Sequence, residues 1–157
     1  MINETEQVVK INEMDRNVQK EILKRCGMAI RFIDNPDKEL QLIAVDKDGD
    51  SIQFIKNPDK EVQLESVKKD GYNVQFIENP DKDVQLTAVD EDGTSIRFIE
   101  NPDKEVQLEA VKQNEYSIQY IKNPDREVQL EAVKRDGFAI QYIDNPDREV
   151  FDILKQY

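Results

Sequence analysis

The stretch NPDKEVQLEAVK, residues 101–112, sets the architecture because the chain repeats it. Close copies begin at Asn57, Asn79 and Asn123, and the triplet Asn-Pro-Asp recurs six times at a constant spacing of 22 residues. All six prolines therefore occupy one place in the repeat, and all five glycines occupy another. Chance does not place the two strongest interrupters of secondary structure so regularly, so the sequence predicts a repeat protein.

The spacing divides the chain into successive copies. Residues 35–144 form five regular copies, residues 13–34 a degenerate first copy, and residues 145–157 a final half copy. We expect a single helical-repeat domain over residues 13–157, with degenerate terminal caps, because end repeats must cover the apolar face that inner repeats give to their neighbours. Residues 1–12 precede the register and are expected to form an N-terminal extension or cap.

The long segment of each repeat favours an α-helix. In the copy that begins at Asn101, this residue is the expected N-cap and Pro102 the first helical residue, followed by acids that suit the positive end of the helix dipole. Good helix formers continue to Asn114, and in most other copies Asp-Gly is the expected stop. A shorter second piece runs from Ser117 toward the next Asn-Pro.

Two other interpretations of the repeat compete with the helix. Val106, Leu108 and Ala110 alternate with polar residues, which leaves a strand interpretation open. The helix is preferred because the segment has about 12 residues with caps at both ends. A continuous coiled coil is excluded by the proline and glycine in nearly every repeat.

The apolar residues of the long segment indicate how the helices pack. Val106, Leu108, Ala110 and Val111 cover a wide arc of a helical wheel, which is typical of a helix buried against neighbours on both sides. The sequence therefore predicts an all-α fold, an α-solenoid of about six two-helix repeats of 22 residues.

The run EVQLEAVKRDGFAIQYI, residues 127–143, resembles the short helical repeats of a bacterial family catalogued as domain of unknown function 4116. The units of that family look like EVxLxAVKxxGxxIxYI, and the similarity covers roughly residues 35–150. The resemblance implies a helical fold. It implies no catalytic residue, because the family has none assigned.

Composition restricts the class of partner. The net charge is −12, so direct binding to nucleic acid or to an anionic membrane surface would be repelled, and no apolar run is long enough to span a membrane. We expect the partner to be a protein with a basic surface. Cys26 is the only cysteine, which excludes an internal disulfide and favours a reducing compartment, the cytoplasm.

The residues that usually carry catalysis or bind metals are scarce or wrongly spaced. The chain has no histidine, which excludes Ser-His and Cys-His nucleophile pairs and histidine metal ligands. The segment DKDGDS, residues 46–51, has alternating aspartates, but its glycine stands at the fourth place where a calcium loop needs it at the sixth. We expect no enzyme activity, no cofactor and no metal site.

Two repeated positions have a structural interpretation. A glutamine falls within the apolar arc of each long segment and is expected to bond between adjacent repeats or to cap a neighbouring helix, rather than to read a ligand. An aromatic residue recurs near the end of each repeat and is expected to lie in the core. The glutamines are Gln19, Gln41, Gln63, Gln85, Gln107 and Gln129, and the aromatic residues are Phe32, Phe54, Phe76, Phe98, Tyr120 and Tyr142.

Three sets of residues are candidates for contact with a partner. The first is an acidic row on the exposed face of the long helices, the second a cluster of acids within residues 79–100, where the net charge is −4, and the third the aromatic residues that follow the glycine slot. The row contains Glu39, Glu61, Asp83, Glu105 and Glu127, the cluster Asp90, Glu91 and Asp92, and the aromatic set Tyr72, Tyr116 and Phe138.

These features favour a non-catalytic protein-binding module with an acidic surface. A narrower hypothesis is an inhibitor that blocks a nucleic-acid-binding effector, as phage anti-CRISPR and anti-restriction proteins do. The alternative is a general cytosolic scaffold with no inhibitory role.

Overall fold

The computed structural model describes residues 11–155, which form helices and no β-strand. The prediction of an all-α fold is confirmed, and the strand interpretation is wrong for these residues. The predicted N-terminal extension, residues 1–12, lies outside the described residues except for Ile11 and Asn12.

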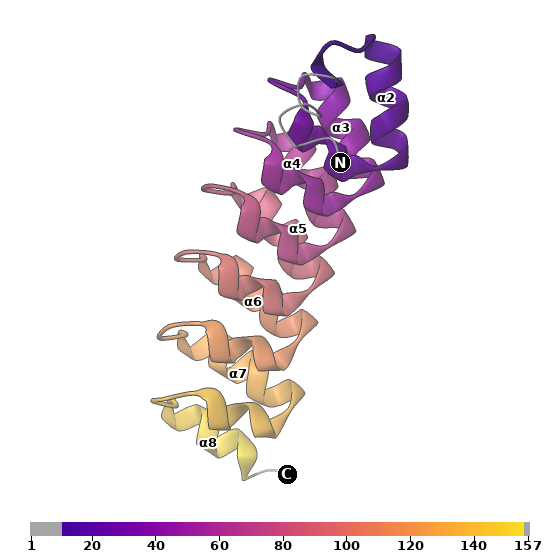
Figure 1. Cartoon of the computed structure of the whole chain (residues 1–157). Coiled ribbons are helices and arrows are strands. Elements are labelled where there is room, and N and C mark those ends of the chain that lie inside the picture. The colour runs from indigo at the N-terminus through magenta and orange to yellow at the C-terminus, as the bar shows by residue number, and fades with distance from the viewer. Residues whose placement is uncertain (1–10, 156–157) are drawn as a thin grey trace. The chain divides into compact units, whose positions relative to one another are not determined.

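Each repeat contains one α-helix and one short 3-10 helix (Figure 1). The α-helices are α2 (Arg16–Arg25), α3 (Lys38–Lys47), α4 (Lys60–Lys69), α5 (Lys82–Glu91), α6 (Lys104–Gln113), α7 (Arg126–Arg135) and α8 (Arg148–Leu154). The 3-10 helices are η1 (Gly27–Phe32), η2 (Gly49–Phe54), η3 (Gly71–Phe76), η4 (Gly93–Phe98), η5 (Glu115–Tyr120) and η6 (Gly137–Tyr142).

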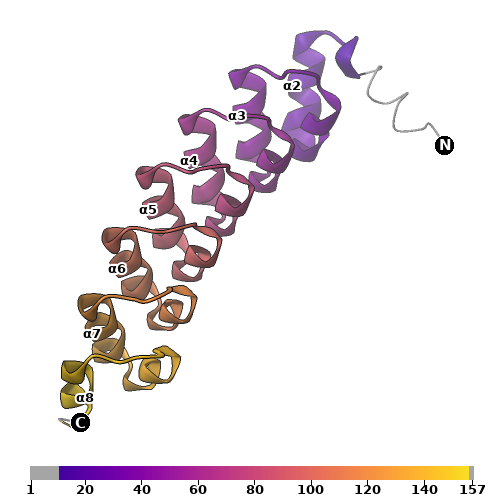
Figure 2. The ribbon, with the colours of Figure 1, turned by 90° about the vertical axis from the view of Figure 1, so that its left-hand side faces the viewer.

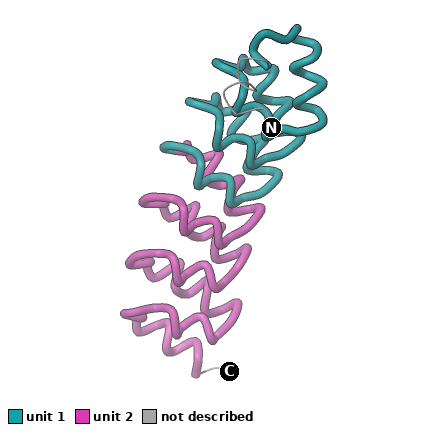
Figure 3. The backbone as a smooth tube through the Cα atoms, in the orientation of Figure 1, with its two compact units in different colours: residues 1–79 teal, residues 80–157 magenta. Residues whose placement is uncertain are grey.

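The chain divides into two compact units, residues 1–79 and residues 80–157 (Figure 3). Within each unit, consecutive α-helices contact one another, and consecutive 3-10 helices do the same. Each unit therefore has a layer of α-helices and a layer of 3-10 helices, which the turned view separates (Figure 2). The predicted α-solenoid of two-helix repeats is confirmed, with a 3-10 helix as the second helix of each repeat.

The α-helices begin two residues later than the sequence predicts. Asp103, not Asn101, is the N-cap of α6, and its carboxylate accepts a hydrogen bond from the amide of Val106 at 3.1 Å. Asn101 has a φ of 50°, in the left-handed region that asparagine tolerates better than most residues, and Pro102 follows it outside the helix. All three residues of Asn-Pro-Asp are common at helix starts, so the pattern alone could not select the cap.

The glycines have a different role from the one predicted. Each regular α-helix ends at an extended residue such as Asp92, with a φ of −148°, whose carboxylate also caps the following 3-10 helix. No described glycine has a positive φ. Gly93 instead needs the space, because a Cβ atom there would lie 2.4 Å from the carbonyl oxygen of Ala110 in the next α-helix. Close packing between repeats, and not helix termination, explains the glycine at position 93.

The core lies between the two layers within each unit. Val106, Ala110 and Val111 of α6 are fully buried, and Ile118 of η5 is 1% exposed. Each fully buried valine or isoleucine contributes about 1.5–3 kcal/mol to folding. Leu108, which the helical wheel placed in the buried arc, is only half-buried. The buried face is therefore narrower than predicted.

Candidate protein-binding surface

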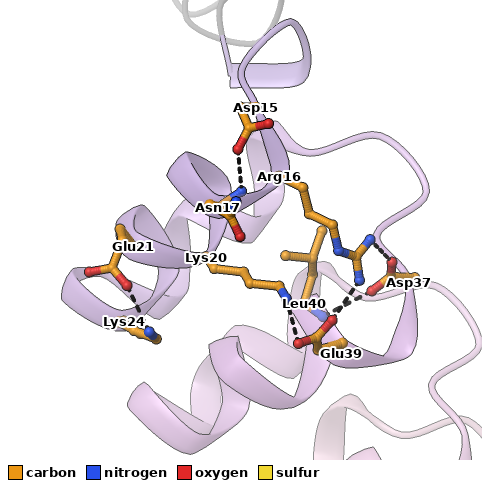
Figure 4. A network of polar contacts seen from close by, with 9 residues as sticks. All are labelled: Asp15, Arg16, Asn17, Lys20, Glu21, Lys24, Asp37, Glu39 and Leu40. Atoms are coloured by element: carbon orange, nitrogen blue, oxygen red, sulfur yellow. Dashed lines mark hydrogen bonds and ion pairs between the residues drawn. The ribbon is translucent and has the colours of Figure 1, made fainter.

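The acidic row is exposed, as predicted, but Glu39, Glu61, Glu105 and Glu127 are paired with bases of the preceding helix. In unit 1, Arg16 of α2 contacts the carboxylates of Asp37 and Glu39 at the start of α3, the second at 2.8 Å (Figure 4). Lys20 of α2 contacts the other oxygen of Glu39 at 2.6 Å (Figure 4). Four charged side chains, two bases and two acids, thus join α2 to the start of α3.

The same contact recurs in both units at equivalent places. A base at the first residue of one α-helix reaches the N-cap aspartate, the glutamate two residues later, or both, in the next α-helix. We call this set the ion-pair ladder. Its further contacts are Lys38 with Asp59 and Glu61, Lys82 with Asp103 and Glu105, Lys104 with Asp125 and Glu127, and Arg126 with Glu149.

The ladder changes the protonation equilibria of its members. The hydrogen bond to Glu105, followed by that to Asp103, raises the pKa of Lys82 above its ordinary value. The amide of Val106 and the ammonium of Lys82 lower the pKa of Asp103. The side chains of Lys82 and Glu105 are 47% and 64% exposed, so water screens the pair, and such exposed pairs contribute little to stability. The ladder therefore neutralises the acidic row more than it stabilises the fold.

The acidic cluster lies at the C-terminal end of α5. Asp90 and Glu91 are exposed and have no ion-pair partner among residues 11–155. Asp92 has a structural role, since its carboxylate accepts hydrogen bonds from the amide and the hydroxyl of Thr94 at 2.8 and 2.7 Å. The structure therefore separates the predicted cluster into two solvated acids and one helix cap.

The aromatic residues that follow the glycine slot differ in exposure. Tyr116 is half-buried, and its hydroxyl donates a hydrogen bond to the carboxylate of Asp136 in the next repeat. This bond raises the pKa of Tyr116 to about 12. Tyr72 is also half-buried, whereas Phe138 is 76% exposed beside a hollow of about 510 Å³ that Leu154 also lines. Phe138 is thus the member of this set most accessible to a partner.

The two units also contain a series of grooves that the sequence did not predict. In unit 2, one groove of about 500 Å³ lies between Tyr120 and Tyr142, and another of about 610 Å³ lies between Phe98 and Tyr120. In unit 1, a groove of about 600 Å³ is lined by Phe76. Each groove is also lined by an Asn-Pro pair and by the glutamine of the following α-helix.

The aromatic slot was expected to lie in the core, and this expectation is wrong. Tyr120 and Tyr142 are 38% and 40% exposed, and Phe98 is half-buried. The buried side of the 3-10 helix is occupied instead by residues such as Ile118 and Ser117. The only sequence signal for the groove was the appearance of tyrosine in two of the six copies, since a hydroxyl-bearing ring is less often fully buried.

Two arginines lie over pairs of these rings. The guanidinium of Arg97 is 4.6 Å from the centroid of Phe98 in its own repeat and 5.9 Å from that of Tyr120 in the next. Arg31 in unit 1 is placed in the same way, 4.6 Å from Phe32 and 5.8 Å from Phe54. All four distances lie within the range of about 6 Å in which a cation is attracted to the face of a ring.

The repeated glutamines have a structural role. The amide nitrogen of Gln107 donates a hydrogen bond to the carbonyl of Pro102 at 2.8 Å, and Gln129 makes the same bond to Pro124. The amide oxygen of Gln129 also accepts from the amide of Asp147 in the next repeat at 2.8 Å. The predicted bond between repeats is therefore present at Gln129, while the recurring bond holds the Asn-Pro turn of the same repeat.

Other chemical features are absent from the described part of the chain. Residues 11–155 contain no group of three or more cysteine, aspartate or glutamate side chains placed to hold a metal ion. Cys26 is exposed at the end of α2 and has no disulfide partner. No helix within the same residues is both long and apolar enough to cross a membrane.

The comparisons with known proteins identify a repeat family. The family model described as Domain of unknown function (DUF4116) matches twice, over residues 81–124 and 103–147. No curated protein and no solved structure matches the chain. The two matches overlap by one repeat length, as tandem units should, and they cover α5 to η6. The repeats of residues 81–147 are therefore similar to the units of this tandem-repeat family, to which no function is assigned.

Proposed function

We propose that the chain is a non-catalytic protein-binding module whose contact surface is the series of grooves beside the aromatic rings. The observation that carries this proposal is the regular recurrence of a groove of about 500–610 Å³ with an aromatic, Asn-Pro and glutamine lining. Repeat proteins commonly present such surfaces to other proteins. The net charge of −12 favours a basic partner.

The ion-pair ladder makes the acidic row a less suitable contact surface than the sequence suggested. Glu105 and Glu127 already have lysine partners, which a docking protein would have to displace. Asp90 and Glu91 remain available to steer a basic partner from solution. In this proposal the acids attract the basic partner at long range, and the grooves make the direct contacts with it. A reducing compartment such as the cytoplasm fits the single unpaired Cys26.

The experiment is chemical cross-linking of the tagged protein with its bound partner at about 0.15 M salt, where the Debye length is about 8 Å. Lys56 and Lys122 line grooves, whereas Lys82 and Lys104 lie on the ion-pair ladder. Cross-links from a bound basic protein are expected at Lys56 and Lys122. Failure to retain any partner, or cross-links confined to Lys82 and Lys104, would contradict the proposal.

A narrower form of the proposal is an inhibitor of the phage anti-CRISPR or anti-restriction type, which occupies the nucleic-acid site of an effector. Asp90 and Glu91 are the acids that could replace phosphates there. The ladder reduces the number of free carboxylates, so imitation of a long duplex, with one charge per about 1.7 Å, is disfavoured. Competition of this protein with DNA or RNA for purified effectors tests this form, and a scaffold role predicts no competition.

A further inference from the structure

The arrangement of rings and cations in unit 2 is incomplete at one place. Between Phe98 and Tyr120 the chain supplies its own guanidinium, from Arg97. Between Tyr120 and Tyr142 the equivalent residue is Gln119, which carries no charge. We propose that this second place, the Tyr120–Tyr142 slot, receives an arginine side chain of the partner protein. This inference rests on the proposed function and specifies the chemistry of the partner.

The side chain of Gln119 does not compete strongly for the slot. Its amide nitrogen donates a hydrogen bond to the carbonyl of Tyr116, at 3.0 Å, within its own 3-10 helix. The groove beside it has a volume of about 500 Å³, which accommodates a guanidinium group and part of its aliphatic stem. An incoming arginine would therefore lie where Arg97 lies one repeat earlier, with little rearrangement of Gln119.

One ring of the slot, that of Tyr142, is held in place before the partner arrives. Tyr142 packs edge-on against Tyr116 in a T-shaped contact, with centroids 5.8 Å apart and an interplanar angle of 87°. Tyr116 is itself fixed by its hydrogen bond to Asp136. A partner arginine therefore does not have to order both rings, which lowers the entropic cost of binding.

The charges around the slot are compatible with a guanidinium. Asp144 and Lys122 both line the groove, so its own net charge is close to zero. Lys122 also lines the neighbouring groove that Arg97 occupies, so its presence does not prevent a guanidinium from lying there. The net charge of −12 supplies the longer-range attraction. Arginine is preferred to lysine, because its planar cation stacks on rings and is less strongly hydrated.

The test uses the full chain and two synthetic peptides of equal charge, one with three Arg-Gly-Gly units and one with three Lys-Gly-Gly units. Titration followed by NMR should show ring-proton shifts at Tyr120 and Tyr142, and binding of the arginine peptide tighter by roughly threefold, as expected for an exposed cation–π contact. Equal affinity of the two peptides, without shifts at these rings, would overturn the proposal.

Two variants test the slot itself. Gln119→Arg places the chain's own guanidinium in the slot, as Arg97 does in the preceding repeat, and should abolish the preference for arginine. Glu131→Gln changes the net charge by the same amount on α7 and should leave the preference unchanged. Both variants should melt at the same temperature as the unaltered protein. Arginine already occupies the place equivalent to Gln119 in two other copies, at Arg31 and Arg97. If Gln119→Arg retains the full preference, the proposal is wrong.

The reverse variant makes a positive prediction. Arg97→Gln vacates the place between Phe98 and Tyr120 and should add a second site for the arginine peptide in unit 2. If the Gln119→Arg variant still bound a natural basic partner, the proposal for the Tyr120–Tyr142 slot would be wrong, while the proposed function would stand. Absence of any partner for the unaltered chain would count against the proposed function, whatever the peptides do.

Discussion

At the N-terminal ends of the α-helices, Lys82 of one helix contacts Glu105 of the next at 2.5 Å, so these two charges are paired within the chain. At the C-terminal ends of the 3-10 helices, Tyr120 and Tyr142 flank a groove in which the neutral Gln119 stands at the place equivalent to Arg97. The first edge is satisfied internally and joins the repeats. The second edge leaves apolar and aromatic surface in contact with water. A partner that covers this surface gains the most binding free energy.

The largest loss of stability is expected at a close contact on which both the ion-pair ladder and the edge with the aromatic rings depend. Gly93 begins η4, and a Cβ atom there would lie 2.4 Å from the carbonyl oxygen of Ala110. Gly93→Ala should therefore force η4 and α6 apart and destabilise the protein by about 1–3 kcal/mol, measured by urea unfolding. The contacts of the ion-pair ladder and the positions of the aromatic rings should both be disturbed.

Gly137→Ala is the matched control for this substitution. A Cβ atom at Gly137 would meet only Cδ2 of Leu154, at 3.0 Å, and this flexible side chain can move. The loss of stability should be clearly smaller than at Gly93. A larger loss at Gly137 would mean that glycine is required for backbone conformation and not for space.

A smaller effect is expected when only the N-terminal edge is altered. Asp103 caps α6 and also contacts Lys82 at 3.1 Å. Asp103→Ala removes both interactions and should cost about 0.5–2 kcal/mol in thermal or urea unfolding, most of it from the cap. Asp103→Asn keeps a capping oxygen and removes the charge, so it should cost no more than a few tenths of a kcal/mol.

Acid titration of these variants separates the two contributions further. Because the pKa of Asp103 is lowered in the folded protein, its contribution is present above the ordinary value of 3.8 and is lost as the pH falls through the lower, folded pKa. Asp103→Asn should therefore lose less stability than the unaltered protein below about pH 4. Equal losses in the two proteins would show that the negative charge of Asp103 contributes nothing, either to the cap or to the ladder.

The smallest effect concerns the ring edge. The pKa of Tyr116 is raised to about 12 from an ordinary value of 10.0, chiefly by its bond to Asp136. The neutral tyrosine is favoured in the folded protein, so this contribution is present below pH 10 and is lost as the pH rises toward 12. Absorbance titration should show one tyrosine that ionises near pH 12.

Asp136→Asn tests the cause of this shift. The substitution preserves an oxygen that can accept from the amide of Phe138, as Asp136 does at 2.8 Å, but it removes the negative charge beside Tyr116. The pKa of Tyr116 should move toward 10, with little change in melting temperature at neutral pH. An unchanged titration would mean that the two side chains are not bonded in solution.

Much of the fold could be predicted because the residues that interrupt secondary structure recur at fixed places in the chain. The constant spacing of Asn-Pro-Asp and of glycine defined the repeat length, the number of regular copies and the helical class. The exact cap was missed because asparagine, proline and aspartate each fit a helix start, and only the left-handed φ of Asn101 places the cap at Asp103. Periodicity locates an element more reliably than its terminal residues.

The candidate site was predicted less well, because sequence spacing does not reveal distance between repeats. Lys82 and Glu105 are 23 residues apart and belong to two repeated rows, but nothing in either row shows that the side chains meet. The aromatic slot was placed in the core because large rings are usually buried. The 3-10 helix has only six residues, and its inner side is already filled by Ile118 and Ser117, so the ring of Tyr120 lies outside.

The sequence by itself determined that this chain is a helical repeat protein with a strong negative charge and no histidine chemistry. Those properties follow from composition and from backbone restrictions that act within a few residues, where proline, glycine and capping side chains have local effects. Only the tertiary structure decided which charges are neutralised and which rings remain accessible. Both depend on how closely one repeat approaches the next, at contacts such as Gly93 against Ala110, and that distance is set by packing and not by local sequence.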